Sequence, residues 1–235
     1  MSSYQISNSE KSALWSNGWV VLKNFISDDL INLLDQEAKS LQENIPEGKF
    51  PTSVTNEDGK LLVMNSLDNK SEFIFDLCRD KMFIDAAEML CGKAVVPIHA
   101  EMFSKPQPGT PPTPPHQDQI FYEEHFNDEI AITFWCPLDN VSHGDGALEY
   151  AKTTENRLLP HRLSDSIDFG KEIIDSSGFQ FEPVYLEKGD VVIHHAYTIH
   201  RSGKIENSRP RRAFAFNFRT SSFLEGRRKN NFDEL

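Results

Sequence analysis

Residues 211–219 read Arg-Arg-Ala-Phe-Ala-Phe-Asn-Phe-Arg. Successive side chains of a β-strand point to opposite faces of the sheet, so this stretch separates into two sets. The two sets are Arg212, Phe214, Phe216 and Phe218 on one face, and Arg211, Ala213, Ala215, Asn217 and Arg219 on the other. The phenylalanine face is expected to pack into an apolar layer. The other face is mostly small, and it leaves room for another molecule beside Arg211.

A second stretch, residues 130–136, alternates in the same way. One face is larger and apolar and carries Ile130, Ile132, Phe134 and Cys136. The other face is smaller and more polar and carries Ala131, Thr133 and Trp135. Two strands that each offer a roomy face predict a barrel lined by a pocket. The alternative is an ordinary half-exposed strand, which alternates as well.

The rest of the chain divides at about residue 92 into a helical part and a β-rich part. Apolar periodicity and N-terminal signals predict one helix from Ser27–Asp29 to Glu43 and a second from Ser71 to about Leu90, with a loop over 45–56. The remaining predicted strands are 94–105, 129–137, 147–151, 179–186, 190–194 and 211–219. Pro97 places part of the first strand at an edge or bulge, and the proline-rich stretch 106–115 cannot form an interior strand. The predicted class is mainly β with packed helices.

Length and composition limit the possible classes of protein. A chain of 235 residues can bury a core without disulfides, and its three cysteines form no CxxC pair, which is typical of reduced thiols in the cytoplasm. A net charge of -12 disfavours nucleic acid and anionic membranes as partners, and no apolar run is long enough to span a bilayer. We therefore expect a cytoplasmic protein whose partners are neither nucleic acid nor a membrane. Its oligomeric state stays open.

Chemistry is indicated by His116-Gln117-Asp118, followed far downstream by a histidine and then by Arg211. Two histidines and one carboxylate form a ligand set suited to non-haem Fe(II), with coordination positions left open. An arginine near such a metal can hold a carboxylate through two parallel hydrogen bonds. This pattern predicts an iron site that also binds a small keto acid.

The third metal ligand cannot be chosen from spacing alone, because three histidines compete for the position. They are His194, His195 and His200, which follow the predicted buried strand that begins after Gly189-Asp190. The histidines expected to be structural or on the surface are His99, His125, His143 and His161.

Several segments together resemble the phytanoyl-CoA dioxygenase superfamily of Fe(II)/2-oxoglutarate-dependent oxygenases. They are Pro115-His-Gln-Asp118, Gly189-Asp-Val-Val192, His200-Arg-Ser-Gly203 and Arg211-Arg-Ala213. The resemblance implies a double-stranded β-helix (jelly-roll) core of about 93–220, with a helical part of about 1–92 and a tail of 221–235, as a single domain. It also implies Fe(II) ligation by His116, Asp118 and His200. It would place Arg211, Ser202 and Trp135 at the 2-oxoglutarate.

The implied activity is oxidation by Fe(II), 2-oxoglutarate and O2, with release of succinate and CO2. Hydroxylation of an unactivated C–H bond of a small molecule is the expected outcome, although desaturation or ring formation would need the same ligands. The candidate substrate-binding residues are Gln119, Tyr122, Glu101 and Phe103. The sequence departs from the family where Gly146-Ala-Leu-Glu149 runs into Lys152-Thr-Thr-Glu155 instead of Pro-Gly-Ser-His.

Two other classes of protein fit part of the pattern. A histidine–aspartate–histidine set can hold catalytic zinc in a hydrolase, but a hydrolase has no evident need for a keto-acid clamp at Arg211. A jelly-roll sensor without turnover could bind metal and ligand in the same way.

Overall fold

The computed structural model describes residues 4–43, 53–56, 58–122, 130–152, 157–165 and 170–221. The helices are α1 (Asn8–Asn17), α2 (Asp28–Glu43), α3 (Glu72–Leu77) and α4 (Lys81–Cys91), with 3-10 turns η1 (Leu67–Asn69) and η2 (Asp118–Phe121). The strands are β1 (Trp19–Leu22), β2 (Ser53–Thr55), β3 (Leu61–Met64), β4 (Val95–Lys105), β5 (Thr113–His116), β6 (Ala131–Pro137), β7 (Leu148–Ala151), β8 (His161–Leu163), β9 (Lys171–Ile173), β10 (Phe181–Pro183), β11 (Val191–His195), β12 (His200–Ser202) and β13 (Arg211–Thr220).

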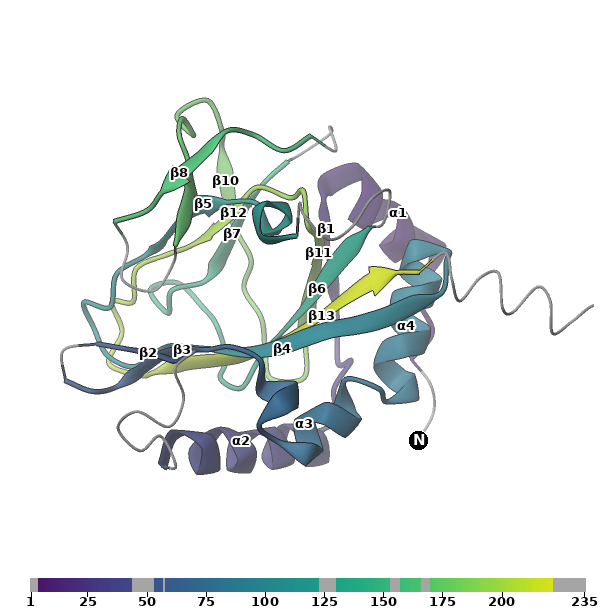
Figure 1. The fold of residues 1–235 in the computed structure, drawn as a ribbon, viewed down its shortest axis with the longest axis horizontal. Helices are drawn as coiled ribbons and strands as arrows, with labels where there is room; N and C mark the ends of the chain where they lie inside the picture. Colours follow the sequence, from purple (N-terminus) through teal and green to yellow (C-terminus); the bar gives the residue numbers. More distant parts are fainter. Residues whose placement is uncertain are drawn as a thin grey trace, which may run out of the picture.

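Two antiparallel sheets form the core of the fold. The larger has seven strands in the order β1-β11-β6-β13-β4-β3-β2, and the smaller has four in the order β10-β7-β12-β5. Helices α2, α3 and α4 lie on one side of the large sheet, and the small sheet lies on the other (Figure 1). The mainly β jelly-roll with packed helices that the sequence predicts is confirmed.

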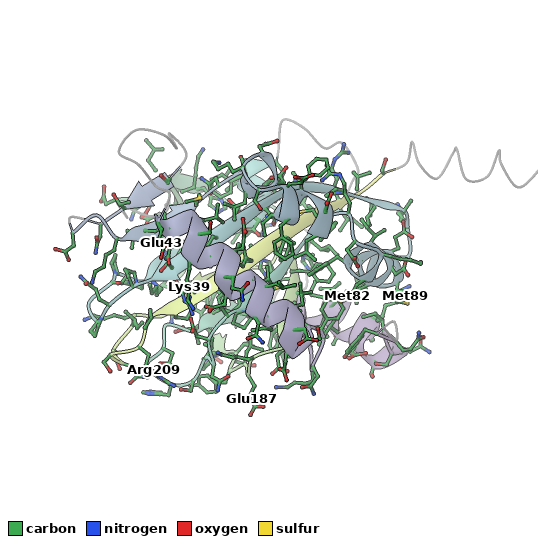
Figure 2. All side chains as sticks on the ribbon, turned by 90° about the horizontal axis from the view of Figure 1, so that it is seen from below. Lys39, Glu43, Met82, Met89, Glu187 and Arg209 are labelled. Carbon is green, nitrogen blue, oxygen red and sulfur yellow. The ribbon has the colours of Figure 1, made fainter. Side chains whose placement is uncertain are left out.

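The two faces of β13 separate these layers as its alternation predicts. The phenylalanine face is buried against the helices, where the rings of Phe216 and Phe83 of α4 lie 4.9 Å apart. Figure 2 shows α2, with Lys39 and Glu43 near one end, lying across this side of the sheet. On the opposite face, Ala213 and Ala215 pack with Trp135 and Tyr150 in a separate cluster between the sheets. The small side chains thus leave space in the interior of the barrel.

Prolines occur in strands where the ladder tolerates them. The register between β4 and β13 shifts beside Pro97, so this proline lies at a bulge as predicted. Strand β5 contains Pro114 and Pro115 and is an edge strand that pairs only with β12 among the described residues. The proline-rich segment is therefore partly a strand, although not an interior one.

The N-terminal part contains more strand than the sequence predicts. It supplies β1, β2 and β3 to the large sheet, and β2 lies inside the segment predicted as a loop. Helix α1 was not predicted, although Ser7 and Glu10 form a capping box at its start. The positive φ of 96° at Gly18, which ends the helix, is a conformation that glycine adopts without strain.

The single helix predicted from Ser71 to Leu90 is wrong. The chain forms two helices there, because the Asp80 carboxylate accepts a hydrogen bond from the Met82 N–H at 2.7 Å and starts α4 anew. The predicted strand at 179–186 is also too long, since β10 covers only Phe181–Pro183. The tail after Ser221, the segment 153–156 and His125 lie outside the described residues.

Candidate active site

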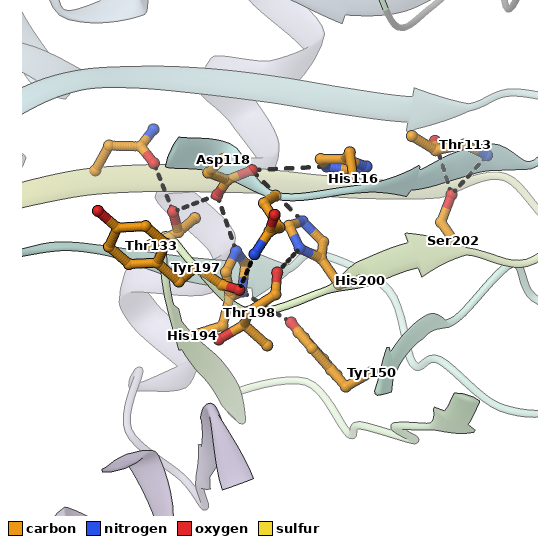
Figure 3. Close-up of polar contacts among 12 residues, drawn as sticks. Thr113, His116, Asp118, Thr133, Tyr150, His194, Tyr197, Thr198, His200 and Ser202 are labelled. Carbon is orange, nitrogen blue, oxygen red and sulfur yellow. Dashed lines mark hydrogen bonds and ion pairs between the residues drawn. The ribbon is translucent and has the colours of Figure 1, made fainter. Parts of the chain in front are cut away.

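His116, Asp118 and His200 come together between the two sheets. His116 ends β5 and His200 begins β12, and the two are direct cross-strand neighbours. Asp118 starts η2 two residues after His116, and one potential ligand atom from each of the three lies within 4.8 Å of the others. Asp118 Oδ1 lies 3.6 Å from Nε2 of both histidines (Figure 3). The arrangement can hold one metal ion.

The hydrogen bonds of the two histidines suit metal binding. Nδ1 of His116 lies 2.8 Å from the Pro114 carbonyl, and Nδ1 of His200 lies 3.0 Å from the Thr198 carbonyl. A carbonyl only accepts, so each Nδ1 carries the proton and donates it. Each Nε2 therefore directs a lone pair towards Asp118, which is the tautomer a metal ligand needs.

Electrostatics favour the same protonation states. Burial lowers the pKa of His200 well below its ordinary value, and the neighbouring His116 and His194 lower it further. Burial alone would raise the pKa of Asp118, but electrostatic interaction with His200 and close contacts with His116 and His194 hold it well below its ordinary value. The site thus combines an ionised carboxylate with a neutral His200 ring.

The three side chains line a cavity of about 670 Å³. Arg211, Ser202 and Trp135 line it too, and the Arg211 guanidinium carbon lies 5.2 Å from the centre of the Trp135 ring. The Ser202 hydroxyl donates to Thr113 Oγ1 at 2.8 Å and accepts from the Thr113 N–H at 3.2 Å. A buried guanidinium and a hydroxyl pair thus share one cavity with the metal-binding residues.

Three of the four residues predicted to meet the substrate also line the cavity, namely Glu101, Phe103 and Tyr122. Gln119 does not, because it is buried beside Ala196, whose carbonyl accepts its backbone N–H at 2.9 Å. Phe121 lines the cavity instead.

His99 was expected to be structural or on the surface. It lines the cavity, and its Nε2 lies 3.4 Å from Glu101 Oε2. Burial alone would lower the pKa of His99, but the hydrogen bond and charge of Glu101 raise it above its ordinary value. The register of the large sheet places His99 opposite Asn217, on the same face as the small residues of β13.

Sequence reasoning also missed the surroundings of Asp118. Its Oδ2 lies 3.0 Å from both His194 Nε2 and Thr133 Oγ1. His195 lies on the other face of β11, stacked on Trp15. Strand alternation already separates His194 from His195, but only the fold shows that His194 reaches Asp118.

Known proteins resemble this chain in sequence and in structure. The sequence model of the family described as Phytanoyl-CoA dioxygenase (PhyH) matches residues 15–213. The peroxisomal phytanoyl-CoA dioxygenase of Mus musculus is 24% identical over 226 residues, covering 87% of this chain and 66% of that protein. That of Bos taurus is 24% identical over 221 residues, covering 86% and 65%. The chain thus spans slightly less than two thirds of the length of these relatives.

Solved structures support the fold. EvdO2 from Micromonospora carbonacea var. aurantiaca complexed with 2-oxoglutarate aligns with a TM-score of 0.75 and 20% identity, over 94% of this chain and 93% of its own. The epimerase SnoN in complex with Fe3+, alpha ketoglutarate and nogalamycin RO aligns with a TM-score of 0.71 and 18% identity, over 89% and 82%. At these identities the likeness establishes the fold alone.

A jelly-roll cavity that combines two histidines and an aspartate with a buried arginine has the ligand set typical of the non-haem Fe(II) class of proteins. Within that class, the sequence model matched over residues 15–213 identifies the family of this chain. The chain belongs to the phytanoyl-CoA dioxygenase family.

Proposed function

We propose that this protein uses Fe(II), 2-oxoglutarate and O2 to hydroxylate an unactivated C–H bond of a small molecule, releasing succinate and CO2. The observation that carries the proposal is the presence of His116, Asp118, His200 and Arg211 in one cavity. The same cavity argues against the zinc hydrolase, for which a buried arginine beside the metal has no evident use.

Each residue would have a separate task. His116, Asp118 and His200 would hold Fe(II), which together with 2-oxoglutarate and O2 supplies the oxidation of the C–H bond. The planar guanidinium of Arg211 would bind the distal carboxylate of 2-oxoglutarate in a two-pronged contact. The Ser202 hydroxyl would turn its proton from Thr113 Oγ1 to the same carboxylate and act as a further donor. Trp135 beside Arg211 would limit the position of the cosubstrate. The enclosing sheets would exclude water from the site.

The cavity wall supports a small molecule with both apolar and polar groups. Apolar side chains from β2, β3 and β4 line it, namely Val54, Val63, Ile98 and Phe103. Glu101, which lies between Ile98 and Phe103 on β4, lines the cavity too, and its Oε1 has no hydrogen-bond partner among the described residues. A hydroxyl or ammonium group on the substrate would satisfy this oxygen.

Hydroxylation is proposed separately from the use of Fe(II) and 2-oxoglutarate, because the same cofactors can serve other oxidations. The structures that share this fold include an epimerase and a carbocyclase as well as EvdO2. Asp118 supplies a complete ligand set, which favours hydroxylation over halogenation, because similar halogenases leave that position empty for chloride. Hydroxylation remains the simplest outcome for the substrate.

Anaerobic titration of Fe(II)-loaded protein with 2-oxoglutarate tests the proposal. A visible metal-to-ligand charge-transfer band is expected, and it should be lost in Arg211→Ala at the same 2-oxoglutarate concentration. Arg212→Lys is the matched control, since Arg212 faces the helices and pairs with Asp35 and Asp139 instead. Absence of the band in folded, iron-loaded protein would favour the sensor or the hydrolase.

A further inference from the structure

The two oxygens of the Asp118 carboxylate have different surroundings. Oδ1 lies 3.6 Å from Nε2 of both His116 and His200, whereas Oδ2 is turned towards the large sheet. There it meets Thr133 Oγ1 and His194 Nε2, each at 3.0 Å (Figure 3). Oδ1 is therefore the oxygen available to a metal, and the orientation of Asp118 depends on what holds Oδ2.

Thr133 is a poor anchor because its single hydroxyl proton has two acceptors. Besides Asp118, the Asn217 carbonyl oxygen lies 2.8 Å from Thr133 Oγ1. The amide orientation of Asn217 is set by Glu101, to which its NH₂ group donates at 3.3 Å. Turning the amide over would direct its oxygen at the Glu101 carboxylate. The Thr133 proton is therefore shared between Asn217 and Asp118.

His194 is better placed to hold Oδ2. Its Nδ1 lies 2.9 Å from the Tyr150 hydroxyl, and both side chains are buried. Tyr150 is itself fixed between Trp19 and His200, with ring centres 5.2 and 5.8 Å away. If the phenol donates to Nδ1, the proton of the neutral ring lies on Nε2 and points at Asp118. The other tautomer would set a lone pair against a carboxylate oxygen, which is repulsive.

We infer that His194, oriented by Tyr150, is a positioning residue that holds Asp118 Oδ2 and makes Asp118 bind the metal through Oδ1 alone. The inference rests on the proposed function, because it assumes a metal at His116, Asp118 and His200. Outer partners of this kind fix the orientation of a ligand, and their loss weakens metal affinity. A substitution at His194 should therefore weaken metal binding even though His116, Asp118 and His200 are all unchanged.

The test is calorimetric titration of the purified full chain with Co(II), without cosubstrate. His194→Met removes the donor and keeps an apolar side chain of similar length, and we expect Co(II) affinity to fall by about 10- to 100-fold. His194→Gln keeps an N–H near the position of Nε2 and should recover most of that loss. Thr133→Val should lose less than His194→Met. His195→Met is the control, because His195 is buried on the opposite face of β11 and should leave affinity unchanged.

A second measurement covers the case in which His194→Met fails to fold. Two-bond proton–nitrogen NMR of the metal-free wild-type protein should show the His194 ring protonated at Nε2, with Nδ1 as the acceptor. An Nδ1-protonated ring would overturn the inference, as would unchanged Co(II) affinity in folded His194→Met. A loss in His194→Gln equal to that in His194→Met would also contradict it. If the wild type binds no Co(II), the proposed function fails first, so the two failures are distinguishable.

Discussion

Arg211 and Arg212 are adjacent and chemically identical, yet β-strand alternation gives them different surroundings. Arg211 lines the cavity beside Trp135. Arg212 points to the helix side, where its guanidinium lies 2.7 Å from Asp35 and 2.9 Å from Asp139. Burial would lower the pKa of Arg212, but hydrogen bonds and charge attraction from Asp139 and Asp35 raise it. One arginine therefore secures α2, and the other faces the cavity.

Arg211→Lys should weaken 2-oxoglutarate binding while leaving Fe(II) binding intact. Lysine keeps the charge but loses one of two parallel hydrogen bonds, and a hydrogen bond to a charged group contributes about 1.5–3 kcal/mol. We expect the 2-oxoglutarate dissociation constant to rise by about 10- to 100-fold, measured from the charge-transfer band. Arg212→Lys should bind as the wild type does. Equal affinity in Arg211→Lys would show that another residue holds the cosubstrate.

Glu101→Gln should weaken substrate binding and leave 2-oxoglutarate binding unchanged. The carboxylate lines the cavity, and the change replaces an acceptor oxygen with an NH₂ group at nearly constant volume. For a substrate that donates to Glu101, we expect KM to rise by about ten-fold, as for the loss of one hydrogen bond to a charged group. The charge-transfer titration with 2-oxoglutarate should not change. An unaltered KM would remove Glu101 from the substrate contacts.

At the scale of elements, the helices position the sheet that carries the site. Phe83 of α4 is fully buried and packs on Phe134, Phe216 and Phe218, which alternate with cavity-facing residues of β6 and β13. The apolar layer on one face thereby fixes the strands whose other face carries Thr133, Trp135 and Asn217. Stability and site geometry are linked through the backbone of the same two strands.

Phe83→Ala should destabilise the protein by about 3–5 kcal/mol, the usual cost of removing a buried aromatic ring and leaving a cavity. Phe75→Ala is the matched control in α3, because the Phe75 ring is 41% exposed and rests under Arg79. Its cost should stay below about 1 kcal/mol. Chemical denaturation of both variants measures the difference. A similar loss of stability in both variants would show that the buried Phe83 ring stabilises the protein no more than the exposed Phe75 ring does.

Local patterns predict the parts of the fold that depend on neighbouring residues. The alternation of 211–219 predicts both faces of β13, and the periodicity of 28–43 predicts α2 with its bounds. The contact between His194 and Asp118 joins positions 76 residues apart, so no local pattern reports it. The same holds for His99, which reaches the cavity through the pairing of β4 with β13. Family resemblance identifies the candidate ligands, but the residues that orient them follow from packing.

At the scale of the whole molecule, burying histidines links stability to pH. His195 is almost fully buried, and its Nδ1 has no hydrogen-bond partner among the described residues. Burial, with a smaller effect of His194, lowers the pKa of His195 to about 4 from an ordinary value of 6.5. His200 shifts in the same direction. As the pH falls below the ordinary histidine pKa, the unfolded chain therefore binds protons at these two histidines before the folded protein does.

The free energy of unfolding of the metal-free protein should fall as the pH drops below about 6.5. Because the folded-state pKa of His195 is depressed, its stabilising effect is complete above 6.5 and is lost as pH falls towards 4. One pKa unit corresponds to about 1.4 kcal/mol. The shift of His195 alone should therefore lower the free energy of unfolding by about 2 kcal/mol between pH 7.5 and pH 5. His195→Phe keeps a flat ring to stack on Trp15 but cannot be protonated, so its stability should depend less on pH by that amount. Urea denaturation of both proteins at several pH values measures the difference, and parallel curves would mean that His195 is protonated as readily in the folded protein as in the unfolded chain.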